Sequence, residues 1–318
     1  IFAQTYENWE ICVADGSPMG KSCERVLRRY ADRDDRVKYL ILGENKGISG
    51  NTNAAMDMAS GDFILLADHD DTLTPNALYE VAKAINADPL NDVIYSDEDK
   101  LDMDGGALFE PHFKPDFDPD LLTSTNYICH LFAVNRDLVE EVGQFDERFD
   151  GAQDYDFIFR CTEKARKIYH IPKVLYHWRC HQGSTASNPE SKLYAFEAGA
   201  RAIKAHFDRL GIETESIEKG VDYGKYHVRF AIHGEPLVSV IIPNKDHTAD
   251  LDVCVRSLME KATYKNLEYI IIENNSTEPA TFEYYEKLQR DHENVKVVTW
   301  EREFNYSAIN NFGVKYAP

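Results

Sequence analysis

The regular alternation of short apolar segments with helix-forming segments constrains the fold of this chain more than any other feature of its sequence. The apolar segments that have the length of buried strands are Ile11–Ala14, Val37–Leu42, Phe63–Ala67 and Val93–Ser96. The segments between them have helical character, as at Asn51–Ala59. Strands joined by helices at this spacing predict an α/β fold, with a largely parallel central sheet flanked by helices.

The strand Phe63–Ala67 leads directly into an acidic cluster. Asp68, Asp70 and Asp71 follow it, and Pro75 begins the next helix. Two like charges ~4 Å apart repel by about 4 kcal/mol at an intermediate dielectric, so a cation or a proton is expected to relieve the repulsion. Carboxylate oxygens suit Mg²⁺ and Mn²⁺, and open α/β sheets bind ligands at the carboxyl ends of their strands. The cluster is therefore a candidate metal site, with an acidic helix cap as the alternative.

The net charge limits the partners that the chain is expected to bind. The sequence has 55 Asp and Glu residues against 35 Lys and Arg residues, a formal net charge of −20. This charge argues against nucleic acid and anionic lipid as ligands, because both attract basic proteins. The six cysteines form no C-x-x-C pair, and no apolar run approaches the ~20 residues that cross a bilayer. We therefore expect a reduced protein of the cytoplasm, without a transmembrane segment.

A repeat divides the chain. The sequence TYKNLE at Thr263–Glu268 repeats TYENWE at Thr5–Glu10, an offset of 258 residues, and Val295 falls on Val37 at the same offset. We predict a first domain at 1–212 that lacks its first strand and helix, and a linker with one strand at 213–235. A second domain, cut before its own acidic cluster, is predicted at 236–318.

Several short motifs occur in a characteristic order along the chain. They are QTYENWE, VADGS, NKGISGNTN, ASGDFILLADHDD, GQFDERF, QDYD and VLYHWR. In this order they resemble the motifs of family 2 glycosyltransferases with the GT-A fold, over roughly residues 1–185 and again over 237–318. The resemblance implies a tandem-domain transferase of the polysaccharide or O-antigen type. Its donor would be a UDP- or dTDP-linked sugar, its cofactor Mn²⁺ or Mg²⁺, and its acceptor a glycan or lipid-linked glycan.

The resemblance also implies which residues bind the donor. Asp15 resembles the carboxylate that accepts hydrogen bonds from the nucleotide base, although an Asp before Gly is also a common turn residue. Asp68 resembles the first residue of the D-x-D motif, on the ribose side. Lys46 and Arg179 are placed near the diphosphate. Because a first strand normally helps to hold the base, this piece of the chain is expected to bind its donor weakly and to be inactive alone.

The metal ligands implied by the resemblance are Asp70, Asp71 and His177. A single His on a strand is as often a core residue, so His177 has an alternative role. Asp154 in QDYD resembles the general base that removes a proton from the acceptor hydroxyl in a direct displacement with inversion. The competing carboxylate is Asp156, which is expected to pair with Arg160 one helical turn later.

Two other functions remain open from the sequence. Asp68, Asp70 and Thr72 also fit the D-x-D-x-T box of haloacid-dehalogenase-like phosphatases, in which Asp68 would be the nucleophile. That box normally follows the first strand of its domain, whereas two strand–helix units precede it here. The third reading is a catalytically inactive domain that binds a sugar nucleotide or a glycan.

Overall fold

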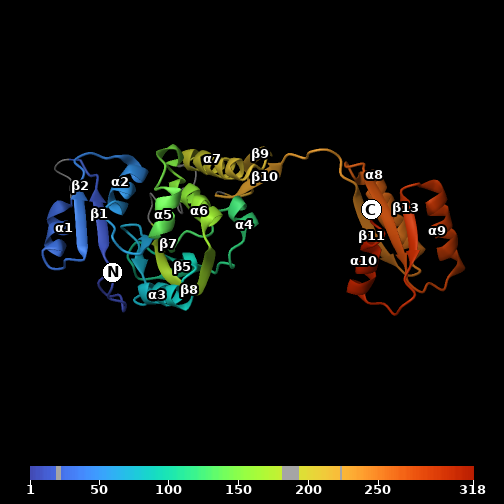
Figure 1. The fold of residues 1–318 in the computed structure, drawn as a ribbon, viewed down its shortest axis with the longest axis horizontal. Coiled ribbons are helices and arrows are strands. Elements are labelled where there is room, and N and C mark those ends of the chain that lie inside the picture. Colours follow the sequence, from blue (N-terminus) through green and yellow to red (C-terminus); the bar gives the residue numbers. More distant parts are fainter. Residues whose placement is uncertain (19–22, 181–192, 223) are drawn as a thin grey trace. The chain divides into compact units, whose positions relative to one another are not determined.

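The computed structural model describes residues 1–18, 23–180, 193–222 and 224–318. The chain divides into two compact units, Ile1–Ala231 and Ile232–Pro318, and the division falls within the segment expected to be a linker (Figure 1). Among the described residues, none of the helices combines the length and the apolar composition needed to span a membrane.

The first unit begins with the strand–helix repeats that the sequence predicts. In chain order these are β1 (Ile11–Asp15), α1 (Glu24–Ala31), β2 (Val37–Ile41) and α2 (Gly47–Met56). The strands β1 and β2 pair in parallel, from Ile11 opposite Val37 to Asp15 opposite Ile41. The carboxyl end of β1 therefore presents Asp15 at the edge where α/β sheets bind ligands.

A six-stranded sheet forms the centre of the first unit. Its strands are β3 (Phe63–Leu66), β4 (Thr72–Leu73), β5 (Asn91–Leu101), β6 (Leu108–His112), β7 (Phe132–Asn135) and β8 (Lys167–Arg179). The order is β3-β7-β5-β8-β4, with β6 paired to β5. Only β5 and β8 pair in parallel, since β7 runs antiparallel to both β3 and β5. The α/β class is confirmed, but this sheet is mixed rather than largely parallel, because the unpredicted strand β7 inserts between two predicted ones.

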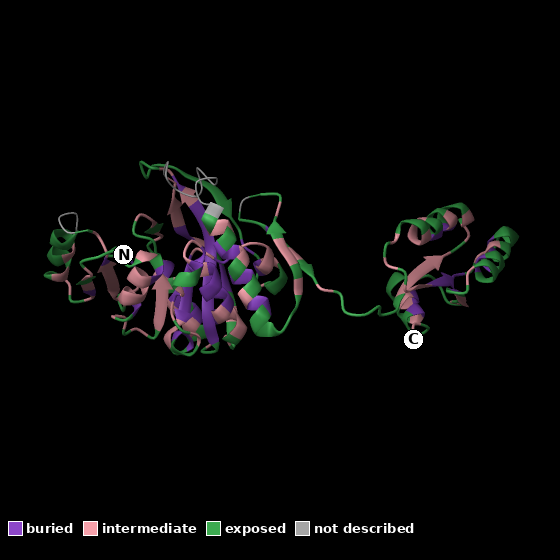
Figure 2. Ribbon diagram, turned by 90° about the horizontal axis from the view of Figure 1, so that it is seen from above, coloured by how far each residue is buried: buried purple, intermediate pink, exposed green. Residues whose placement is uncertain are grey.

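Helices cover both faces of this sheet. They are α3 (Ala77–Ala87), α4 (Pro119–Ser124), α5 (Arg136–Val142), α6 (Gln153–Lys164) and α7 (Leu193–Leu210), with the 3₁₀ turn η1 (Glu147–Phe149) before α6. Successive side chains of β5 point to opposite faces. Val93 and Tyr95 pack with α6 and α7 on one face, whereas Ile94 packs with α3 on the other. The buried strands in the middle of the unit are purple in Figure 2.

The segment 213–235 contains two strands rather than one. They are β9 (Thr214–Lys219) and β10 (Tyr226–Phe230), which pair antiparallel. The ring of Tyr226 stacks on Phe196 of α7 with 4.8 Å between centroids, and its hydroxyl donates to the Phe196 carbonyl oxygen. The hairpin thus packs on α7 as part of the first unit.

The second unit repeats the start of the first. Its elements are β11 (Val238–Asn244), α8 (Thr248–Lys261), β12 (Leu267–Glu273), α9 (Pro279–Asp291), β13 (Val295–Thr299) and α10 (Tyr306–Val314). The three strands form a parallel sheet in chain order. Tyr269 pairs with Val295, and at an offset of 258 this is the pairing of Ile11 with Val37. The sequence repeat is therefore also a repeat of strand register.

Candidate functional site

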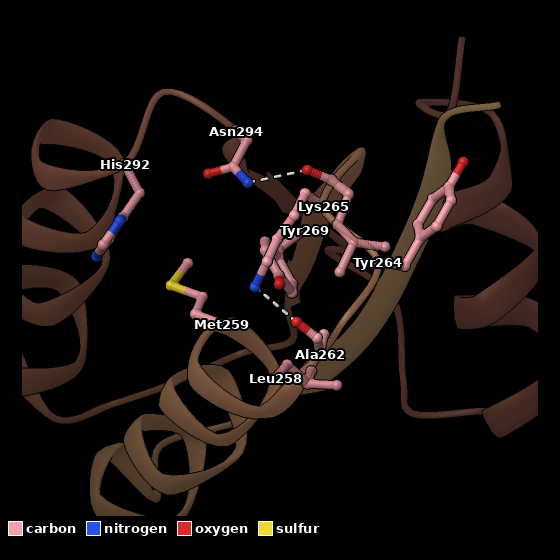
Figure 3. A pocket seen from close by; sticks show the side chains of 9 residues that line it. Leu258, Met259, Ala262, Tyr264, Lys265, Tyr269, His292 and Asn294 are labelled. Atoms are coloured by element: carbon pink, nitrogen blue, oxygen red, sulfur yellow. Dashed lines mark hydrogen bonds between the residues drawn. The ribbon is translucent and has the colours of Figure 1, made fainter. Parts of the chain in front are cut away.

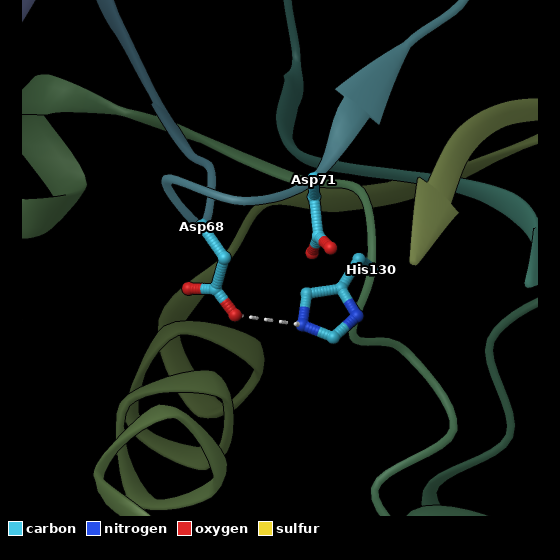
Figure 4. A group of neighbouring side chains, drawn as sticks. All are labelled: Asp68, Asp71 and His130. Carbon is cyan, nitrogen blue, oxygen red and sulfur yellow. Dashed lines mark ion pairs between the residues drawn. The ribbon is translucent and has the colours of Figure 1, made fainter. Parts of the chain in front are cut away.

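The acidic loop after β3 lies beside the segment that leads into β7. Leu66, the last residue of β3, pairs with Phe132, the first residue of β7. This antiparallel register places Asp68, two residues beyond Leu66, near His130, two residues before Phe132. The ligand atoms of Asp68, Asp71 and His130 all lie within 4.8 Å of one another, and both carboxylates face the imidazole ring (Figure 4). His130 Nε2 is 3.9 Å from Asp68 Oδ2.

Asp71 is held by groups from β8. Its carboxylate accepts hydrogen bonds from the Tyr176 hydroxyl and, at 2.7 Å, from the backbone N–H of Arg179. The Tyr176 hydroxyl in turn accepts a hydrogen bond from the backbone N–H of Asp68, with 3.1 Å between the heavy atoms. Burial and the bond to Asp71 raise the pKa of Tyr176, so the phenol remains a donor. One buried tyrosine thereby links the carboxylate of Asp71 to the backbone of Asp68.

His130 is fixed by its neighbours on several sides. Its ring stacks on Tyr176 with 4.8 Å between centroids, and its Nδ1 is 3.3 Å from Oε2 of Glu98 on β5. Burial opposes a charge on the ring, but Cys129 and Glu98 outweigh it and raise the pKa of His130 well above its ordinary value. The Glu98 carboxylate thus favours a proton on the imidazole when no metal is bound.

The carboxylates near the loop act on one another electrostatically. The Asp68 side chain is 63% exposed, but the protein that crowds it, together with the negative charges of Asp71, Asp70 and Asp154, raises the pKa of Asp68, while His130 opposes this shift. Asp154 therefore lies within electrostatic range of the acidic loop, although it belongs to α6. Four carboxylates that share one field favour the binding of a cation.

The two carboxylates of the QDYD segment have different surroundings. Asp154 is half-buried in the first turn of α6, and its Oδ2 accepts a hydrogen bond of 2.9 Å from the side-chain amide of Asn126. Asp156 is fully buried and pairs with Arg160 at 2.8 Å and with Arg209 at 3.6 Å. The predicted pair of Asp156 with Arg160 is confirmed, and it gives Asp156 a structural role.

The other two predicted metal ligands lie outside the three-residue group. Asp70 is partly exposed, and its Oδ1 lies 4.0 Å from Nδ1 of His69. His177 pairs with Asp99 on β5, with 2.5 Å between Nδ1 and Oδ1. Because His177 and Tyr176 are successive residues of β8, their side chains point in opposite directions. In the part of the chain that the structure describes, the group that offers a metal three ligand atoms is that of Asp68, Asp71 and His130.

The predicted donor-binding residues lie at strand ends. Asp15 is buried at the end of β1 and accepts hydrogen bonds of 2.9 Å from the backbone N–H groups of Ser17 and Cys23. Lys46 is exposed in the turn before α2. Arg179 ends β8, and its Nε donates to the backbone carbonyl of Asp70 at 2.7 Å. Arg179 therefore braces the acidic loop from the side of β8.

Sequence reasoning missed His130, Tyr176 and Asn126 as members or supports of the site, and it did not connect Glu98 with a metal ligand. Glu98 lies just beyond the predicted strand Val93–Ser96, in the part of β5 that continues this strand. His130 precedes a buried apolar run, and no motif marks it. Their positions depend on the pairing of β7 with β3 and of β5 with β8, which no local sequence pattern reveals.

Two cavities accompany these elements, one in each unit. A cavity of about 320 Å³ next to His130 is lined by Glu98, Asp99, Lys100, Glu110, His112 and Trp178. The second unit has a cavity of about 240 Å³ between the end of α8 and the start of β12, where Lys265 donates to the Ala262 carbonyl and Asn294 to that of Leu267 (Figure 3). It lies at the amino end of β12, opposite to the end where such sheets bind ligands.

Comparison with known proteins identifies the family. Residues 1–143 and 239–318 match the model of glycosyl transferase family 2. The chain belongs to this family. Its α/β fold is of the GT-A class, and the phosphatase reading of the D-x-D-x-T box is not supported.

The relatives connect the chain with longer proteins. It is 43% identical to the uncharacterized protein y4gI of Sinorhizobium fredii (strain NBRC 101917 / NGR234), over 99% of this chain and 35% of that protein. It is 37% identical to the O-antigen biosynthesis protein RfbC of Myxococcus xanthus, over 100% of this chain and 24% of that protein. The chain thus spans about a third or less of these relatives. Among solved structures, residues 1–349 of TarS from S. aureus match with 19% identity and a TM-score of 0.49, over 64% of this chain and 58% of that chain.

Proposed function

We propose that the first unit transfers a sugar, with inversion, from a UDP- or dTDP-linked donor to a glycan or lipid-linked glycan acceptor. The observation that carries this proposal is the meeting of Asp68, Asp71 and His130, from two distant segments, within range of Asp154. Family membership supports sugar transfer, and the likeness to an O-antigen biosynthesis protein supports a role in cell-surface polysaccharide or lipopolysaccharide synthesis. The proposed place of action is the cytoplasm, including the cytosolic face of the inner membrane.

The donor set fits a divalent metal ion. Two carboxylates and one imidazole within 4.8 Å supply the oxygen ligands that Mg²⁺ and Mn²⁺ prefer, with a nitrogen ligand that favours Mn²⁺. In the proposal, Asp68, Asp71 and His130 hold the ion, and Asp70 and His177 stay as further predicted ligands. When bound, the ion would stabilise the negative charge of the leaving nucleoside diphosphate.

Asp154 is the proposed general base. A displacement with inversion needs a carboxylate that reaches the acceptor hydroxyl. The hydrogen bond from Asn126 orients the carboxylate of Asp154, whereas the two arginines around Asp156 hold that residue in the interior. These surroundings support Asp154, rather than Asp156, as the proposed base.

The nucleotide is proposed to bind along the strand ends. Asp15 would accept hydrogen bonds from the base in place of those that it now accepts from Ser17 and Cys23. Lys46 and Arg179 would offset the charge of the diphosphate, which an acidic protein needs. Asp68 would face the ribose in addition to its place in the metal group.

The proposal is tested by transfer assays on the full chain. UDP- and dTDP-sugars are incubated with Mn²⁺ and mixed glycan acceptors, and the products are read by mass spectrometry, with calorimetry of donor binding in parallel. Sugar addition supports the proposal. Donor binding without any product, in the full chain and in the longer protein alike, would instead support the inactive binding domain.

A further inference from the structure

His130 connects the proposed metal group with a buried glutamate behind it. On one side of the ring, Nε2 lies 3.9 Å from Asp68. On the other side, Nδ1 lies 3.3 Å from Glu98 Oε2, the oxygen that also accepts a hydrogen bond from the backbone N–H of His130. One carboxylate therefore holds both the ring and the backbone of His130.

Glu98 is itself held by a buried lysine. The side chain of Lys114 is 0% exposed, and its Nζ lies 3.6 Å from Glu98 Oε2. The same Nζ donates to the carbonyl oxygens of Ile128 and His130. Glu98 and Lys114 thus bind the segment that carries His130 at its N–H and carbonyl groups. Burying two charges for this purpose costs free energy that an apolar pair would not, which suggests a requirement for a fixed geometry.

We propose that Glu98 is a positioning residue that holds His130 with Nε2 directed at Asp68 and Asp71, so that the imidazole completes the proposed cation site. The inference rests on the proposed function, because that function requires the cation. A carboxylate on the second nitrogen of a ligating His fixes the ring and its tautomer, and loss of such a partner lowers metal affinity about 10- to 100-fold. Glu98 touches neither donor nor acceptor in this scheme and acts through His130.

The first unit contains a matched pair at another place. His206 Nδ1 lies 2.6 Å from Glu163 Oε1, both side chains are largely buried, and the ring stacks on Phe159. Within the described ranges, His206 belongs to no group of three potential metal ligands. Glu163→Gln therefore removes a carboxylate from Nδ1 of a buried histidine that belongs to no candidate metal site. This variant serves as the control.

The test measures binding of Mn²⁺ to the full chain by electron paramagnetic resonance. Glu98→Gln is expected to weaken Mn²⁺ binding about 10- to 100-fold. Pulsed spectra should show the coupling of a bound imidazole nitrogen in the wild type and its loss in Glu98→Gln. Glu163→Gln should leave the affinity within about twofold and the nitrogen coupling unchanged. Unaltered Mn²⁺ affinity, or an unaltered nitrogen coupling, in folded Glu98→Gln would overturn the proposal.

Three further variants make the outcome decisive. If Glu98→Gln does not fold, Glu98→Asp keeps the charge beside Lys114 but withdraws the carboxylate from Nδ1, and the same loss of affinity and coupling is expected. Asp68→Asn and Asp71→Asn distinguish a failure of the proposed cation site from a failure of the positioning role of Glu98. If they leave Mn²⁺ binding unchanged, the cation site of the proposed function fails. If they weaken it while Glu98→Gln and Glu98→Asp do not, the positioning role alone fails.

Discussion

Tyr176 shows how single atoms organise the candidate site. Its hydroxyl donates to the Asp71 carboxylate and accepts from the Asp68 backbone, while its ring stacks under His130. All three members of the metal group thus contact one fully buried side chain. The type of a residue does not by itself decide its role. Asp154 and Asp156 are both aspartates of α6, and it is their surroundings that differ.

The two aspartates of α6 are expected to respond differently to the same substitution. Asp154→Asn should retain donor binding and lower turnover at least about a hundredfold, because the amide cannot accept the proton. Asp156→Asn should instead lower the free energy of unfolding by about 2 kcal/mol, because Arg160 and Arg209 lose their charged partner. Turnover assays and urea unfolding of both variants check this. Unchanged turnover in Asp154→Asn would remove it as the base.

The raised pKa of Asp68 predicts that this residue, a proposed metal ligand, lowers the stability of the metal-free protein at neutral pH. A carboxyl group whose pKa is raised by folding favours the native state below the unfolded pKa and loses that contribution as the pH rises through the folded pKa. At pH 7, without metal, Asp68→Asn should therefore raise the unfolding temperature, and the difference from the wild type should shrink below pH 4. Thermal unfolding between pH 3 and pH 8 measures it. A variant less stable than the wild type at pH 7 would contradict the account.

At the scale of elements, the sequence predicted those parts whose patterns are local. The strands β1, β2 and β3 occur close to their predicted ranges, since short apolar runs identify them. The strand β5 runs on through Asp97–Asp99, although acidic residues are rare in strands, because groups of β8 and the neighbouring loops form hydrogen bonds with their carboxylates. The strands β7 and β9 were not predicted, since their pairing depends on other segments of the chain, whereas the one strand predicted in 213–235 is present. His130 was missed for the same reason.

The packing of the hairpin on α7 gives a prediction at the same scale. A Cβ atom at Gly199 would lie 1.8 Å from the Tyr226 hydroxyl. Although alanine is favoured over glycine in a helix by about 1 kcal/mol, Gly199→Ala should destabilise the first unit by about 1–3 kcal/mol through this overlap. Gly106→Ala, where no atom lies within 4 Å, is the control for urea unfolding. Addition of Tyr226→Phe should recover part of the loss; no recovery would show that the hairpin does not pack here.

At the scale of the whole molecule, the repeat gives each unit a buried carboxylate at the same strand end. Glu273 occupies in β12 the position that Asp15 occupies in β1, and it accepts a hydrogen bond of 2.9 Å from Tyr285. The candidate base and metal group belong to the first unit, so the proposed chemistry is assigned to it. The chain spans about a third or less of its relatives y4gI and RfbC, which makes the activity of the longer protein part of the proposal.

The central claim is that the acidic loop after β3 binds a divalent ion that in turn binds a sugar diphosphate. Calorimetric titration of the full chain with UDP and dTDP, with and without Mn²⁺, tests it most directly. Mn²⁺ should strengthen binding of one nucleotide at least about tenfold, or 1.4 kcal/mol, in the wild type and in the exposed-loop control Asp104→Asn, but not in Asp71→Asn. Equal strengthening in Asp71→Asn, or no effect of Mn²⁺ on the wild type, would contradict the claim.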